Sequence, residues 1–72
     1  METWDDLKKG GSAHYRTGGV QPIDLMRDLG IFKSFALGSI IKYAARNSRQ
    51  PLNPKDMEKI IHYAKLIMAS DL

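Results

Sequence analysis

The sequence predicts an all-α protein, a small domain of three to four helices that oligomerisation completes. Apolar residues recur at helical spacing along two long stretches, each bounded by residues typical of helix ends, and no stretch alternates like a half-buried strand. With 72 residues, the chain has room for one domain only. We expect an N-terminal arm or short helix over residues 1–13 and a single helical domain over residues 14–72.

The first short helix is expected from Trp4 to Lys9. Thr3 stands where a capping side chain is needed, and two aspartates follow it in the first turn, where they favour the helix dipole. Trp4 and Leu7 are three positions apart and therefore share one helix face. This face predicts docking either on the rest of the chain or on a neighbouring subunit.

Two further helices are expected in the middle of the chain. The shorter begins at Pro22, because proline suits the first helical position, and Gly30 ends it about two turns later. The longer runs from Phe32 to about Asn47, with apolar residues over more than half of its circumference, so contacts from several sides are expected. Gly38 costs about 1 kcal/mol relative to alanine inside this helix. It predicts the close approach of another helix or, less commonly, of a ligand.

The last helix is expected from Pro54 to about Ser70, because Asn53 can cap it and Pro54 suits its first position. One apolar stripe is predicted to pack on the rest of the domain. Its members are Met57, Ile60, Ile61, Ala64, Ile67 and Met68. Leu66 falls on the polar side, and with Trp4 it is predicted to contact another subunit.

Composition narrows the class of protein. Hydrophobic residues make up 43% and charged residues 26%, which is typical of a globular chain. No cysteine is present, so disulfides and thiolate metal sites are excluded, and self-association is the expected source of further stability. No apolar run reaches the roughly 18 residues of a membrane span, and the first residues lack the pattern of a signal peptide. We therefore expect a soluble, cytoplasmic protein.

The net charge of +3 is unevenly distributed. No acidic residue occurs between Leu29 and Lys55, and this interval contains four basic ones, Lys33, Lys42, Arg46 and Arg49. Such a block is typical of a protein with an anionic partner. The alternative is a solvated basic face that acids elsewhere in the chain balance.

The predicted ligand-binding site combines a strip of the long helix with a glycine-bounded loop. Ser39, Lys42 and Arg46 are spaced three and four apart and so lie on one side of the helix. Arginine can bind phosphate through two parallel hydrogen bonds, and lysine adds a point charge. The loop contributes His14, Tyr15, Gly18 and Gly19, with stacking groups and backbone amides. Alternatively, Lys42 and Arg46 pair with Asp24, Asp28 or Asp56 and bind no ligand.

The sequence contains no common catalytic or metal-binding motif. Two histidines without cysteine fall short of the three or four ligands of a zinc site, so we expect no metal centre. No serine stands in a nucleophile elbow, and a P-loop is absent. Enzymatic activity stays open, with no cofactor expected except Mg²⁺ if the protein transfers a phosphoryl group.

A set of residues from His14 to Leu66 carries a family resemblance. They are, in chain order, His14-Tyr15, Gly18-Gly19, Gln21-Pro22-Ile23-Asp24, Phe35, Gly38, Lys42-Tyr43, Arg46, Asp56, Lys59 and Tyr63. This pattern resembles a phage-encoded family of small proteins of unknown function, a longer relative of which is a podophage nucleotide kinase without a P-loop. Family members usually have glutamate at the position of Gln21 and asparagine at that of Ser39. If these side chains position a metal or a phosphate in the family, their replacement here argues against phosphoryl transfer. The resemblance implies a phage or prophage origin, a place in the host cytoplasm and a nucleotide-related role.

These observations predict a small phage-type protein that self-associates and binds a phosphorylated ligand, a nucleotide. Nucleic acid is expected to bind weakly and without sequence preference at most, because few aromatic side chains accompany the charges. No membrane partner is expected. Two alternatives remain. One is a helical oligomeric interaction protein that acts on a host protein or nucleic acid without a small-molecule site. The other is a nucleotide kinase without a P-loop, with Asp24 or Asp56 as its metal-binding carboxylate.

Overall fold

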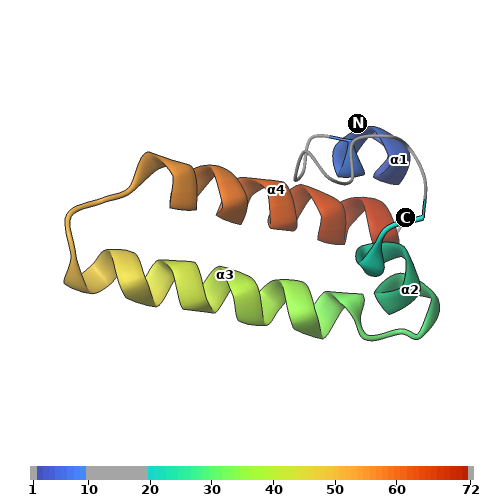
Figure 1. Ribbon diagram of the computed structural model, residues 1–72, viewed down its shortest axis with the longest axis horizontal. Helices are drawn as coiled ribbons and strands as arrows, with labels where there is room; N and C mark the ends of the chain where they lie inside the picture. Colours follow the sequence, from blue (N-terminus) through green and yellow to red (C-terminus); the bar gives the residue numbers. More distant parts are fainter. Residues whose placement is uncertain (1, 10–19, 72) are drawn as a thin grey trace.

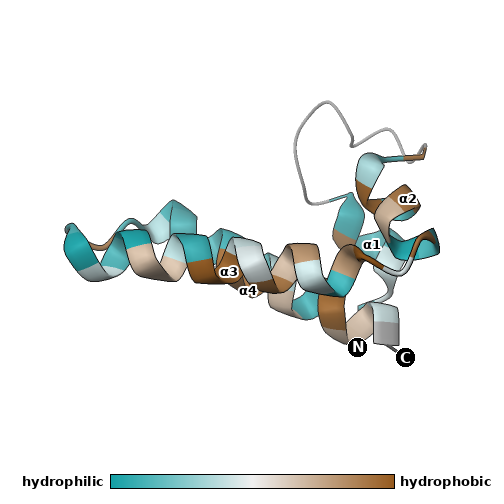
Figure 2. Cartoon of the chain, turned by 90° about the horizontal axis from the view of Figure 1, so that it is seen from below, coloured by the Kyte–Doolittle hydropathy of each residue, from teal (hydrophilic) through white to brown (hydrophobic). Residues whose placement is uncertain are grey.

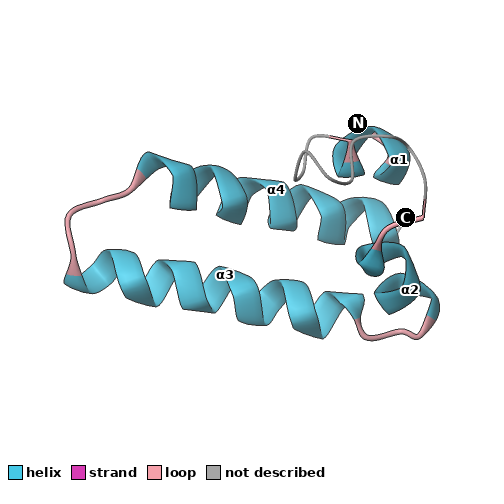
Figure 3. Cartoon of the chain, in the orientation of Figure 1, coloured by secondary structure: helices cyan, strands magenta, loops and turns pink. Residues whose placement is uncertain are grey.

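The computed structural model describes residues 2–9 and 20–71 of the chain. They form four helices, α1 (Trp4–Lys8), α2 (Pro22–Asp28), α3 (Phe32–Arg49) and α4 (Pro54–Asp71). Within these residues no strand occurs, so the predicted all-α class is confirmed (Figure 3).

The two long helices form an antiparallel hairpin, and the two short helices lie at one end of it (Figure 1). Residues 50–53 join α3 to α4 at the far end of the hairpin. The α1 helix packs mainly on α4, and α2 leads directly into α3. The N-terminal helix therefore meets the C-terminal one, although they are distant in sequence.

Three residues predicted at helix ends act there, whereas α3 continues to Arg49, beyond its predicted end near Asn47. The Thr3 hydroxyl oxygen accepts a hydrogen bond of 3.2 Å from the backbone N–H of Asp6 at the start of α1. Gly30 follows α2 with a φ of 76°, a left-handed conformation that suits glycine. The Asn53 side-chain oxygen accepts a hydrogen bond of 2.9 Å from the backbone N–H of Lys55 at the start of α4.

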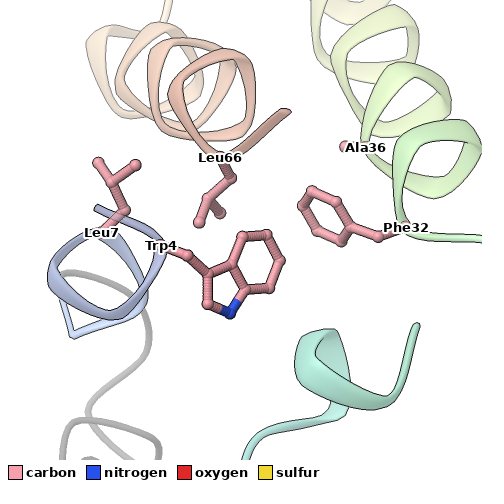
Figure 4. Packing of buried hydrophobic residues seen from close by; sticks show 5 residues of the cluster. All are labelled: Trp4, Leu7, Phe32, Ala36 and Leu66. Carbon is pink, nitrogen blue, oxygen red and sulfur yellow. The ribbon is translucent and has the colours of Figure 1, made fainter. Parts of the chain in front are cut away.

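The hydrophobic core lies where three helices meet (Figure 4). Its buried members are Trp4 and Leu7 from α1, Phe32 and Ala36 from α3, and Leu66 from α4. The Trp4 ring lies edge-on to Phe32, with ring centroids 4.8 Å apart. Leu66 is only 1% exposed, so the prediction that Trp4 and Leu66 contact another subunit is wrong. The α1 helix covers Leu66 within the chain itself, whereas Glu58 and Lys65 of the same polar side stay exposed.

The predicted apolar stripe of α4 is only partly used for packing on α3. Ile61 is 54% exposed and Met68 is 51% exposed, whereas Asp56 is almost fully buried against α3. On α3, Ile41 is 67% exposed. The expected close approach at Gly38 does not occur within the described residues, because a Cβ placed there meets no atom within 4 Å. None of the described helices is long and apolar enough to span a membrane.

Candidate functional site

Arg46 of α3 and Asp56 of α4 form an ion pair near the loop that joins these two helices. The Arg46 Nε donates a hydrogen bond of 2.9 Å to Asp56 Oδ2, and its Nη2 donates to Oδ1, so the pair is bidentate. The Asn47 side-chain amide donates a further bond of 2.9 Å to the same carboxylate. The alternative in which Arg46 pairs with Asp56 is therefore what the structure contains.

These contacts hold the ion pair in its charged form. The hydrogen bond from Arg46 lowers the pKa of Asp56, although burial of the carboxyl opposes this, and the bond from Asn47 adds to the lowering. The bond to Asp56 in turn raises the pKa of Arg46. Since the Asp56 side chain is 3% exposed and that of Arg46 is 49% exposed, only the guanidinium still faces solvent.

Three cationic groups surround the ring of Tyr43. The Lys42 Nζ lies 4.6 Å from the ring centroid, the Lys59 Nζ 5.1 Å and the Arg46 Cζ 5.3 Å. Both lysines are exposed, and among the described residues neither forms an ion pair. We call Lys42, Tyr43, Arg46 and Lys59 the tyrosine cluster.

The structure brings some of the predicted site residues together and not others. Lys42 and Arg46 meet at the tyrosine cluster, as their helical spacing predicts. The Ser39 hydroxyl donates a hydrogen bond of 3.0 Å to the backbone oxygen of Phe35, one turn earlier in α3. The four loop residues of the predicted site, His14, Tyr15, Gly18 and Gly19, lie outside the described residues.

Lys59 joins the cluster from α4 and was not predicted as a ligand-binding residue. The family resemblance included it, but its nearness to Lys42 depends on how α3 and α4 pair. Lys59 follows Asp56 by three positions, so the two share a face of α4. Once Asp56 is paired with Arg46, the same register places Lys59 at Tyr43.

A second polar cluster joins α1 to α2 around Asp24. The carboxylate accepts hydrogen bonds of 2.7 Å from Trp4 Nε1, 3.0 Å from Lys8 Nζ and 2.7 Å from the backbone N–H of Gln21. Burial raises the pKa of Asp24, but these bonds outweigh it and leave the pKa below its usual value. Asp24 therefore pairs with α1, and of the three aspartates named as alternative partners of Arg46 it is Asp56 that forms the pair.

A surface groove of about 790 Å³ adjoins the tyrosine cluster. Tyr43 and Lys59 line it together with Tyr63 and His62 of α4, and carboxylates of Glu2, Asp6 and Glu58 lie on its walls. Burial lowers the pKa of His62, so its imidazole is neutral near neutral pH. Within the described part of the chain, no three metal-ligating side chains converge. The lining also includes Lys55 and Lys65, so the groove offers both cations and hydrogen-bond acceptors.

The fold and this cluster define a small helical-hairpin protein with a basic, tyrosine-centred surface. Residues 9–65 match the model of a family described as a protein of unknown function (DUF3310), and the chain belongs to this family. No curated protein and no solved structure matches the chain.

Proposed function

We propose that this protein binds a phosphorylated ligand, a nucleotide, with its phosphate held between Lys42 and Lys59 at the tyrosine cluster. The observation that carries this proposal is the convergence of three cationic groups on one ring, at 4.6, 5.1 and 5.3 Å from its centroid. Like charges repel one another, so such a group is most stable when an anion lies among its members.

The charges of the cluster support an anion as the ligand. The carboxylate that contacts the cluster is Asp56, and it already accepts hydrogen bonds from Arg46 and Asn47. It therefore balances Arg46 and leaves the charges of Lys42 and Lys59 available to a phosphate. Lysine ammonium groups bind phosphate as mobile point charges, which suits two flexible, exposed side chains on neighbouring helices.

The groove beside the cluster supports a nucleotide rather than free phosphate. Its volume of about 790 Å³ is within the range of small-molecule sites. Tyr63 offers a ring for a base, and Glu58 offers a carboxylate that could accept from a sugar hydroxyl. A bound nucleotide would thus place its phosphate at Lys59 and its nucleoside along the groove.

The test is calorimetric titration with mono-, tri- and cyclic nucleotides and with inorganic phosphate. Lys42→Gln and Lys59→Gln should each weaken nucleotide binding about 10- to 100-fold, the range for a lost hydrogen bond to a charged group. Arg49→Gln is the matched control, because Arg49 is exposed on the same helix and the change removes one charge of the same sign. Its effect should be less than about threefold if local contacts, rather than net charge, hold the ligand.

Two results would contradict the proposal. One is that no nucleotide binds the unmodified protein. The other is that Arg49→Gln weakens binding as much as Lys42→Gln does, which would indicate attraction by net charge alone.

Self-association and an origin in a phage or prophage belong to the same proposal, the latter on the family resemblance alone.

An interaction protein without a small-molecule site is the second candidate, and the exposed apolar side chains of α3 and α4 favour it. For a nucleotide kinase, the support is weaker. Asp24 and Asp56 would have to hold Mg²⁺, and both carboxylates already accept hydrogen bonds from protein donors.

A further inference from the structure

We infer that the docking of α1 and the binding of the nucleotide are linked, so that the ligand binds only while α1 is docked and in turn holds α1 in place. The linkage rests on the proposed nucleotide site and gives that site a means of regulation. Its structural basis is that Glu2, Asp6 and Leu7 form one wall of the groove. We call these three residues the N-terminal wall.

The groove runs along α4 and ends at α1. Its α4 side extends from Lys55 to Lys65, ten positions and so about 15 Å along the helix axis. Lys59 lies between them, and Glu2 pairs with Lys65 at 3.2 Å. Figures 1 and 2 both show α1 at one end of the hairpin, away from the hydrophilic end that is teal in Figure 2. Because Tyr63 follows Lys59 in the direction of Lys65, a nucleotide with its base at Tyr63 lies next to the N-terminal wall.

The α1 helix is too short to persist without docking. It has five residues, and isolated helices of fewer than about 12 residues are marginal in water. Its attachment consists of Trp4 and Leu7 in the core, with polar contacts at Asp24 and the ion pair of Glu2. Undocking therefore unfolds α1 and removes the whole N-terminal wall from the groove at once. Segments that depend on a few such contacts open locally before the rest of a fold does.

A series of aromatic rings also connects α1 to the groove. Trp4 lies edge-on to Phe32 at 4.8 Å, and Phe32 lies 6.3 Å from Phe35. Phe35 in turn lies edge-on to Tyr63 at 5.8 Å, and Tyr63 lines the groove. Loss of Trp4 from this series removes the support of the rings that pack against Tyr63. Docking of α1 thus both supplies one wall of the groove and supports the ring on another.

The linkage makes the N-terminal segment a regulator of the site. When only the docked form binds, the apparent dissociation constant equals the intrinsic one divided by the docked fraction. The nucleotide must by the same linkage shift the chain toward the docked form. A change that detaches α1 would therefore abolish binding without altering Lys42 or Lys59.

The first test compares two neighbouring charge reversals outside the groove. Lys8→Glu replaces the ammonium group that lies 3.0 Å from Asp24 by a second carboxylate, and this repulsion should detach α1. Lys9→Glu is the matched control, because Lys9 is exposed and the change of charge is the same. In calorimetric titration, Lys8→Glu should weaken nucleotide binding about tenfold when one molecule in about ten keeps α1 docked. Lys9→Glu should weaken it less than about threefold.

The second test follows unfolding of the unmodified chain in urea, with and without the nucleotide that binds most tightly in the calorimetric titrations. Trp4 is the single tryptophan and is 6% exposed, so its fluorescence reports detachment of α1, whereas circular dichroism reports mainly the long helices. The nucleotide should raise the urea midpoint of the fluorescence change toward that of circular dichroism, because it binds the docked form. In Lys42→Gln, which keeps α1 docked, the same nucleotide concentration should raise this midpoint less.

The outcomes separate the linkage from the proposed function. If no nucleotide binds the unmodified protein, both are overturned. If Lys8→Glu detaches α1 and still binds as tightly as Lys9→Glu, only the linkage is overturned and the lysine site stands. The linkage is also wrong if fluorescence and circular dichroism change together without nucleotide, or if the nucleotide raises the midpoint of circular dichroism alone. This urea experiment decides the question where Lys8→Glu unfolds the whole chain or leaves α1 docked.

Discussion

At the scale of single residues, two aspartates hold the molecule together at opposite ends of the hairpin. Asp56 joins α3 to α4 through Arg46 and Asn47, and Asp24 joins α1 to α2 through Trp4 and Lys8. Each carboxylate accepts several hydrogen bonds, so its replacement leaves donors without partners. Donors left without partners lower the free energy of unfolding more than the loss of an exposed ion pair does.

Asp56→Ala should lower the melting temperature by about 5–15 °C, because Arg46 and Asn47 lose a shared acceptor that is almost fully buried. Differential scanning calorimetry measures the shift. Glu58→Ala, an exposed acid in the same helix, is the control and should shift the melting temperature by less than about 2 °C. Equal shifts in the two variants would contradict a structural role for Asp56.

Arg46→Ala should lower the melting temperature as well, yet weaken nucleotide binding less than Lys42→Gln does. The reason is that Arg46 already donates to Asp56 through two nitrogens. Calorimetric titration beside a melting curve separates the two effects. A loss of binding larger than that of Lys42→Gln would make Arg46 the principal phosphate ligand, as its bidentate geometry allows.

His62 should make stability depend on pH near neutrality. Burial lowers the pKa of His62 below 6.5, while Glu2 raises it and Lys65 lowers it further. The unfolded chain therefore binds a proton more readily than the folded one, and stability present above pH 6.5 is lost as the pH falls toward the folded pKa. Urea titrations at several pH values measure this slope. His62→Gln should reduce it, and an unchanged slope would assign it to other groups.

At the scale of the elements, the sequence predicted where the helices begin and end, but it did not predict which side of each helix faces the core. Thr3, Gly30 and Asn53 act locally, so their effects follow from a few neighbouring residues. The rotation of α4 depends on α1, because Trp4 and Leu7 cover Leu66 from outside the hairpin. A helical wheel drawn for α4 alone cannot show that α1 buries Leu66.

Gly30→Ala should destabilise the fold by about 1 kcal/mol in urea unfolding. The cost comes from backbone strain alone, since φ is 76° and a Cβ there meets no atom within 4 Å. Gly30→Asn is the matched variant, because asparagine tolerates this conformation better. It should cost less than alanine, and the reverse order would contradict strain as the cause.

At the scale of the whole molecule, the described core is small for the apolar surface that surrounds it. Five apolar side chains are buried, whereas ten large ones are exposed. Length and the lack of cysteine predicted a need for self-association, but sequence alone could not say which side would stay uncovered. The basic strip was likewise predictable from spacing, whereas the contribution of Lys59 required the pairing of α3 with α4.

Acid should unfold the protein through both aspartates. Their folded pKa values lie below the usual 3.8, so the stability that they contribute is present above that pH and is lost as the pH falls through the folded values. Melting temperatures measured from neutral to strongly acid pH should fall steeply only below about pH 4. In Asp56→Asn the melting temperature should fall less steeply with acid. If it falls as steeply as in the unmodified protein, Asp56 does not contribute to acid unfolding.

The docking of α1 also sets an order of events in folding. Contacts between α3 and α4 close across a four-residue loop, whereas the pair of Lys65 with Glu2 joins positions 63 apart. Contacts that are close in sequence lose less chain entropy when they form, so we expect the hairpin to form first and α1 to attach last. The single tryptophan, Trp4, lies in this last contact. Its fluorescence therefore reports the attachment of α1, and in urea it should change before the far-ultraviolet circular dichroism of the hairpin does.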